Sequence, residues 1–204
     1  MPFTQNDYEI VQREILYQGI FRMVRYHLRY KLFNGGWSSI VTRELLERSS
    51  AVGVLPYDPV LDQVVLIEQF RPGALANPES PWLLEIVAGI IEPKEKPEAV
   101  AIREAREEAG CEILALYPIT GLFVSPGGSN EYIHIYCGRT NTSAIGGIHG
   151  LEQENEDIRA FVVSAEDAFN MVRDGIIKTT PAIIALQWLQ LNRTLLRELW
   201  STEN

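Results

Sequence analysis

One segment limits the possible fold more than any other, and it runs from Gly89 to Cys111 with the sequence GIIEPKEKPEAVAIREAREEAGC. Pro97 suits the first turn of a helix, because that turn has no intrahelical partner for the N–H that proline lacks. Gly110 suits the residue just past a helix end, where a left-handed backbone is favoured. The segment therefore predicts a loop followed by a helix that begins near Pro97 and ends before Gly110.

This helix would carry two different faces. At about 100° per residue, Glu104, Glu107 and Glu108 fall within one arc. The neighbouring arc is apolar and contains Ala101, Ile102, Ala105 and Ala109. We expect the apolar arc to pack on the fold and the acidic arc to face a cleft. A solvated acidic face is the alternative, and it is the usual meaning of a charge run.

A carboxylate cluster of this kind has a chemical use. Neighbouring carboxylates repel one another unless cations neutralise them. Their hard oxygen atoms suit Mg²⁺, with Mn²⁺ as a possible substitute, and both ions also bind substrate phosphates. The acidic arc therefore predicts a divalent-cation site for diphosphate chemistry.

The spacing of the segment resembles the Nudix box, the signature of the Nudix hydrolases. The defined glycine and polar positions are occupied by Gly89, Glu95, Arg103, Glu104, Glu107, Glu108 and Gly110. Ala105 and Cys111 occupy the two positions that require an apolar residue. Arg103 could pair with Glu107 one helical turn on, or with Glu95, and hold the loop against the helix.

Composition excludes several other classes of protein. The chain has 204 residues and a formal net charge of −9, which argues against nucleic acid or an anionic membrane as partner, since both require a basic surface. We expect no signal peptide and no membrane span, because no apolar run reaches about 18 residues. Cys111 and Cys137 are the only cysteines, so a disulfide framework is not expected and a cytoplasmic location is.

The order of elements predicts an α+β chain with two parts. Residues 1–48 form an N-terminal antiparallel strand extension, with strand-like runs at residues 13–31 and 37–46 around the hairpin signal Asn34-Gly35-Gly36. Two strands alone do not make a stable domain, so this extension must pack on another surface. Residues 49–204 would form the domain that contains the box, which the resemblance implies is a Nudix hydrolase domain, with strands expected at 50–56, 64–70, 82–88, 113–124, 132–137 and 158–163 and helices at 165–173 and 180–200.

The whole chain resembles the bacterial Nudix hydrolases that cleave ADP-ribose. The resemblance is most specific in EQFRPGA, PWLLEIVAG, SPGGSNE and GLEQENEDIR. It implies an α/β/α sandwich around a mixed sheet, Mg²⁺-dependent hydrolysis of ADP-ribose to AMP and ribose 5-phosphate, and a homodimer whose N-terminal strands cross to the partner subunit. Hydrolysis of another nucleotide sugar such as GDP-mannose is the first alternative, and a nucleotide-sugar sensor without catalysis is the second.

The resemblance also implies a role for individual residues. Glu154 corresponds to the general base. The metal ligands correspond to Glu104, Glu108, Glu156 and the backbone carbonyl of Ala88. Substrate contacts correspond to Arg71, Ser125, Pro126, Gly127 and Glu131 in one subunit, and to Ile20, Phe21 and Arg43 from the partner. Taken singly, the loop acids could instead be solvated, the two arginines could be surface charges, and Ser125–Gly128 could be only a turn.

Overall fold

The computed structural model describes residues 3–201, apart from the side chain of Glu154. The chain divides into two compact units. The first contains the residues up to Ser49 together with Phe123–Tyr132, and the second contains Ser50–Leu122 and the residues from Ile133 onward. Within residues 3–201, none of the helices combines the length and apolarity that a membrane crossing requires.

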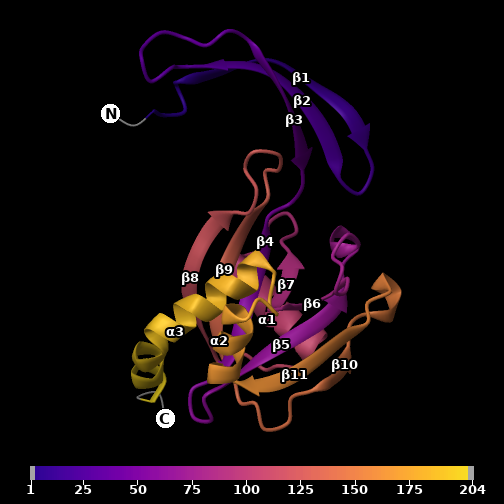
Figure 1. Ribbon diagram of the computed structural model, residues 1–204, viewed down its shortest axis with the longest axis vertical. Coiled ribbons are helices and arrows are strands. Elements are labelled where there is room, and N and C mark those ends of the chain that lie inside the picture. The colour runs from indigo at the N-terminus through magenta and orange to yellow at the C-terminus, as the bar shows by residue number, and fades with distance from the viewer. Residues whose placement is uncertain (1–2, 202–204) are drawn as a thin grey trace. The chain divides into compact units, whose positions relative to one another are not determined.

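The second unit is built on a mixed sheet of eight strands (Figure 1). Its strands are β4 (Ala51–Asp58), β5 (Gln63–Phe70), β6 (Trp82–Glu85), β7 (Val87–Ile90), β8 (Ala115–Phe123), β9 (Tyr132–Arg139), β10 (Gly147–His149) and β11 (Ile158–Ser164). The order is β10-β11-β5-β4-β9-β8, with β6 also paired to β5 and β7 to β4. The sheet is mixed because β4 runs parallel to β9 but antiparallel to β5 and β7.

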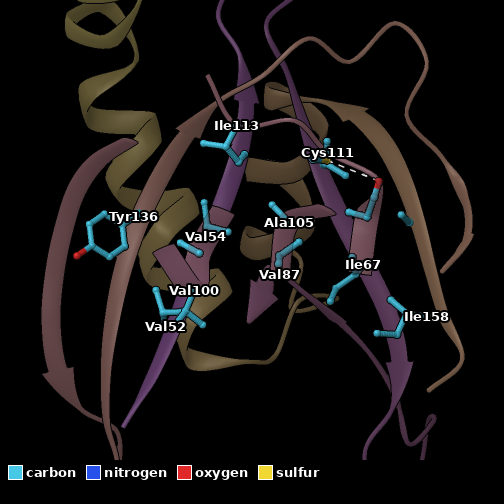
Figure 2. Packing of buried hydrophobic residues seen from close by; sticks show 14 residues of the cluster. Val52, Val54, Ile67, Val87, Val100, Ala105, Cys111, Ile113, Tyr136 and Ile158 are labelled. Carbon is cyan, nitrogen blue, oxygen red and sulfur yellow. Dashed lines mark hydrogen bonds between the residues drawn. The ribbon is translucent and has the colours of Figure 1, made fainter. Parts of the chain in front are cut away.

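Helices cover both faces of this sheet. On one face, α1 (Pro97–Ala109) packs through Val100 and Ala105 against Val52 and Val54 of β4 (Figure 2). On the other face lie α2 (Ala165–Arg173) and α3 (Thr180–Ser201), and Tyr57 of β4 contacts Trp200 of α3 with ring centroids 6.4 Å apart. Alternate residues of a strand point to opposite faces, so this arrangement confirms the predicted α/β/α sandwich.

The box helix begins and ends where the sequence predicts. Pro97 is its first residue, and Gly110 follows it with φ of 63° and an N–H that bonds to the carbonyls of Ala105 and Arg106. The buried stripe differs from the predicted apolar arc in three residues, one of which is Val100, buried although the arc did not include it. Ile102 is 42% exposed, because it lies just beyond the stripe that faces the sheet, whereas Glu108 is only 4% exposed and lies within that stripe.

The first unit is an antiparallel sheet of three strands in the order β1-β2-β3. Its strands are β1 (Tyr8–Gln18), β2 (Arg22–Tyr30) and β3 (Val41–Glu47). The prediction of one strand over residues 13–31 is wrong, because the chain reverses at Gly19, whose N–H bonds to the carbonyl of Phe21 at 3.0 Å. The hairpin signal is confirmed, since Gly35 and Gly36 have φ values of 91° and 78° in the loop between β2 and β3.

A second predicted strand is also divided. Residues 82–88 were expected to form one strand, but β6 pairs with β5 and β7 pairs with β4, with Ile86 between them. Apolar patterning cannot reveal this division, because both short strands are rich in apolar residues. The division lets one segment connect two strands of the sheet and leads directly into the box loop.

Candidate active site

The two outer box carboxylates lie against the backbone of β7. Glu108 accepts a hydrogen bond from the N–H of Ala88 through Oε2 at 3.0 Å. Glu104 lies so close to Gly89 that a Cβ added there would be 2.0 Å from its Oε1 atom. Glycine at position 89 therefore gives Glu104 its place beside the strand, and the structure brings Ala88, Glu104 and Glu108 together.

Burial and mutual repulsion disfavour the charged forms of the carboxylates in this cluster. Burial raises the pKa of Glu108 to about 8; repulsion from Glu104 and Glu156 also raises it, while the Ala88 N–H and Arg71 lower it. Burial likewise raises the pKa of Glu104; Arg103 opposes this rise, and Glu107 and Glu156 add to it. A bound cation would favour the charged carboxylates, so the donor set fits a hard divalent ion. As they stand, the described residues form no group of three His, Cys, Asp or Glu side chains that could hold an ion.

Two arginines border the carboxylates. Arg103 contacts Glu104 at 2.9 Å and Glu107 at 2.8 Å through Nη1, which includes the pairing one turn along the helix that the sequence suggested. Arg71 follows β5 and donates two hydrogen bonds to Glu85. Burial lowers the pKa of Arg71. The hydrogen bonds to Glu85 and the negative charges of Glu85, Glu108 and Glu156 outweigh burial, so the pKa of Arg71 is above its ordinary value.

The acidic loop is attached to the end of the box helix. The N–H of Gly150 bonds to the carbonyl of Glu107 at 3.4 Å. Within the loop, Glu156 accepts a hydrogen bond from the N–H of Leu151 at 3.2 Å through Oε2. Glu154 ends the short helical turn η2 (Glu152–Glu154), but its side chain lies outside the described residues, so its role as a base stays a prediction.

The remaining predicted site residues belong to the first unit. Ile20 and Phe21 lie in the turn between β1 and β2, and Ile20 is 98% exposed. Arg43 lies on β3 and donates from Nη1 to the carbonyl of Thr42 at 2.8 Å. These positions leave the assigned substrate contacts untested.

The Ser125–Glu131 loop is held to the end of β3. The N–H of Leu46 bonds to the carbonyl of Gly128 at 2.9 Å, and the N–H of Gly128 bonds back to the carbonyl of Ser125 at 3.1 Å, which makes a turn of Ser125–Gly128. Pro126 and Gly127 form the centre of this turn. Glu131 pairs with Arg48 at 3.2 Å, and the Arg48 guanidinium lies over the Phe21 ring at 5.1 Å.

Sequence reasoning missed two residues that contact the predicted site residues and a third that supports one of these contacts. Arg48 joins Phe21 to Glu131 in the first unit, and no motif marks it. In the second unit Glu85 accepts hydrogen bonds from Arg71, and Gln69 donates to the same Glu85 oxygen. Glu85 and Gln69 could have been found from the sequence, because each is a polar residue among apolar neighbours in a predicted strand, in the runs WLLEIV and LIEQF.

Comparison with known proteins identifies the class. The NUDIX domain matches residues 47–199, and the chain belongs to the Nudix family. This confirms the interpretation of the Gly89–Cys111 segment. A solved structure described as an ADP compounds hydrolase has a TM-score of 0.71 and 20% identity, and the similarity covers 96% of this chain and all of that chain, which supports the fold alone.

Curated relatives are similar over almost the whole chain. A protein of Escherichia coli strain K12 named ADP-ribose pyrophosphatase is 49% identical over 201 residues, covering 98% of this chain and 96% of the relative. A protein of Haemophilus influenzae with the same name is 47% identical, covering 97% and 93%. A GDP-mannose pyrophosphatase of Cronobacter sakazakii is 32% identical, covering 90% and 95%.

Proposed function

We propose that this chain is a hydrolase that cleaves the diphosphate of ADP-ribose to AMP and ribose 5-phosphate. The observation that carries the proposal is the difference in similarity between two kinds of relative. Identity is 49% to the E. coli ADP-ribose pyrophosphatase but 32% to the GDP-mannose pyrophosphatase. The carboxylates of the box would act on the diphosphate alone, through the bound cation. The preference for one nucleotide sugar over another must therefore come from side chains at the two ends of the substrate.

Nudix hydrolases generally use a divalent metal, and we propose Mg²⁺ here, with Mn²⁺ as a substitute. Glu104, Glu108, Glu156 and the backbone carbonyl of Ala88 would hold it. When bound, the ion offsets the negative phosphoryl oxygens, which otherwise repel a nucleophile. The crowded, partly desolvated carboxylates support this assignment, because burial and repulsion disfavour their charged forms and a bound cation would favour those forms.

The side chains supply binding and proton transfer. We assign Glu154 as the base that takes the proton of the attacking water, since a carboxylate outside the metal ligands can do so. Its loop is attached to α1 through Gly150, which keeps the base near the box. Arg71 is assigned to the substrate phosphates, and Ser125, Pro126, Gly127 and Glu131 to the ribose and phosphate region.

We also propose a homodimer in the cytoplasm. Exposed apolar side chains on β1 support the dimer, and two buried free cysteines fit a reducing compartment. In this dimer Arg43, Ile20 and Phe21 would act in the partner's site. Mixed dimers of Arg43→Ala and Glu104→Gln chains test this, because one intact site per dimer should restore about half of the activity per dimer, whereas sites within one chain would restore none.

A substrate panel tests the activity. We expect kcat/KM with Mg²⁺ to be highest for ADP-ribose among ADP-ribose, GDP-mannose, ADP-glucose and NADH, with AMP and ribose 5-phosphate as products. A tenfold preference for another member, about 1.4 kcal/mol in transition-state binding, would reassign the substrate within the family. Binding of ADP-ribose without metal-dependent turnover would favour the sensor.

A further inference from the structure

The geometry points to Glu85, supported by Gln69, as the residue that positions the Arg71 guanidinium for substrate binding. The inference rests on the proposed function, because it gives Arg71 a diphosphate to bind. It assigns Glu85 no contact with substrate or metal, since its effect passes through Arg71.

A single oxygen of Glu85 receives three donors. Oε2 accepts from Arg71 Nε at 3.1 Å, from Arg71 Nη2 at 2.8 Å and from Gln69 Nε2 at 3.1 Å. The Glu85 side chain is 13% exposed and Gln69 is 7% exposed. Charge-assisted bonds from two nitrogens of one planar guanidinium fix its orientation as well as its position.

The hairpin of β5 and β6 creates this contact. Glu85 is directly opposite Ile67 in the register, and the N–H of Arg71 bonds to the carbonyl of Pro81 at 2.9 Å. Ile67, Gln69 and Arg71 alternate along the chain, so their side chains share the face that α1 covers. Glu108 lies on that same side, and its charge contributes to raising the pKa of Arg71, as does that of Glu156.

The arrangement has two consequences for binding. Nε and one N–H of Nη2 donate to Glu85, whereas Nη1 of Arg71 makes no hydrogen bond to the described residues and can donate to a phosphate oxygen. Without Glu85, the guanidinium would be free to pair with Glu108 or Glu156. That pairing would withdraw Arg71 from the substrate and compete with the cation for the carboxylates.

Glu85→Gln in the full-length chain tests the inference. We expect KM for ADP-ribose to rise about tenfold with kcat within about threefold, and half-maximal activity to require more Mg²⁺. Glu68→Gln is the matched control, because Glu68 on β5 accepts from Nε of Arg159 at 2.9 Å and from Nη2 in the same way, on the opposite face of the sheet. It should leave KM and the Mg²⁺ requirement unchanged.

A double-mutant cycle separates positioning from a merely structural role. In an Arg71→Ala background, Glu85→Gln should produce no further rise in KM, because the residue it positions is gone. An equal rise in both backgrounds, or no rise in either, overturns the inference. If Glu85→Gln lowers the melting temperature strongly, Gln69→Met is the second variant, and it should raise KM in the same direction but less.

The same cycle remains informative if the proposed substrate is wrong. Should another nucleotide sugar of the panel be cleaved, KM for that substrate replaces KM for ADP-ribose, and the substrate assignment fails while Glu85 is still tested. Should none be cleaved, the four members of the cycle, which are the unaltered chain, Glu85→Gln, Arg71→Ala and the double variant, are titrated with ADP and Mg²⁺ by calorimetry. The inference then requires Glu85→Gln to weaken ADP binding only when Arg71 is present, and a lack of ADP binding overturns it.

Discussion

The two sheets of this chain differ in how much of their apolar surface the chain itself covers. Every residue of β4 is buried, in the centre of the eight-stranded sheet. Every residue of β1 except Glu14 is exposed, although the strand contains Ile10, Val11, Ile15 and Leu16. The second unit therefore has its own core, whereas the first unit has apolar side chains that its own chain leaves in water.

Because of this difference, the two sheets are suited to different roles. Burying a side chain such as Leu or Ile contributes about 1.5–3 kcal/mol, and β1 gains little of this within one chain. In the second unit α1 instead places Glu104 and Glu108 beside β7, where the proposed cation would offset their mutual repulsion. One sheet is thus suited to hold charged groups in place, and the other to bind another surface.

The largest expected effect concerns the charges held by the second unit. Glu104→Gln and Glu108→Gln should each reduce kcat with Mg²⁺ by about 10³-fold, because an amide is a poor ligand for a hard cation. The fold should not suffer, since a neutral side chain at position 108 removes a charge that burial disfavours. Steady-state kinetics and thermal melting measure the two quantities, and near-normal turnover by both variants would refute the metal site.

The next effect concerns the apolar strand of the first unit. Ile15→Lys combined with Leu16→Lys places charge on two neighbouring residues of β1. The pair should weaken the proposed dimer by about 10²-fold, the equivalent of about 2.7 kcal/mol. Sedimentation over a range of concentrations measures the dissociation constant.

The matched control for the dimer is a helix residue. Leu191 of α3 is 85% exposed, and Leu191→Lys should leave association unchanged. If the β1 variant dimerises as strongly as the unaltered chain, β1 does not form the dimer interface. If the unaltered chain is an active monomer at assay concentration, the proposed dimer itself is refuted.

A smaller effect should be found at a buried polar anchor of the second unit. Asp58 accepts hydrogen bonds from the N–H groups of Val60, Leu61 and Thr142 and from the Thr142 hydroxyl. Asp58→Ala leaves these donors unpaired and should lower the free energy of unfolding by about 2 kcal/mol. Denaturant titration measures this loss.

The pH dependence of that loss follows from the pKa of Asp58. Burial raises this pKa, but the bonds from Leu61, Thr142 and Val60 outweigh burial and hold it below its ordinary value. A carboxyl whose folded pKa is lowered stabilises the fold above its unfolded pKa, about 3.9, and loses this contribution as pH falls through the folded pKa. The difference between the unaltered chain and Asp58→Ala should therefore shrink below about pH 4, and a constant difference would contradict the assignment.

The sequence was sufficient for the parts of the molecule that depend on local chemistry. Pro97 and Gly110 delimited α1, and the spacing of the box identified the family. What it could not provide is the point where an element or a buried face ends. Residues 13–31 read as one strand because both sides of the turn at Gly19 are β-rich, and Ile102 reads as buried because helical periodicity does not fix the edge of the stripe.

The residues of the candidate site likewise fall into those that the sequence identifies and those that only the structure reveals. Glu104 and Glu108 could be assigned from the box alone, because helical spacing places them together. Arg71 was assigned by resemblance, but the hydrogen bonds that Arg71 and Gln69 donate to Glu85 depend on the register of β5 with β6, which no local pattern reports. The charge balance around Glu108 was equally hidden, since it depends on Glu156 from a distant loop.

The smallest expected effect tests a polar anchor of the first unit against Asp58. Glu47 on β3 accepts from the Tyr26 hydroxyl at 2.6 Å and from Arg13 at 2.7 Å, and its side chain is 17% exposed. Glu47→Gln keeps the size of the side chain but removes its charge, so β2 and β3 should lose about 1 kcal/mol of local stability, less than Asp58→Ala costs.

The effect of Glu47→Gln should also depend on pH. Burial raises the pKa of Glu47, but Tyr26 and Arg13 together hold it below its ordinary value, so this contribution too should disappear as pH falls below about 4. Hydrogen exchange of the β2 and β3 amides, compared between the unaltered chain and Glu47→Gln at each pH, measures the effect. A loss of stability larger than that of Asp58→Ala would contradict this ranking, because the exposed sheet would then depend on its charges as strongly as the second unit depends on its buried polar anchor.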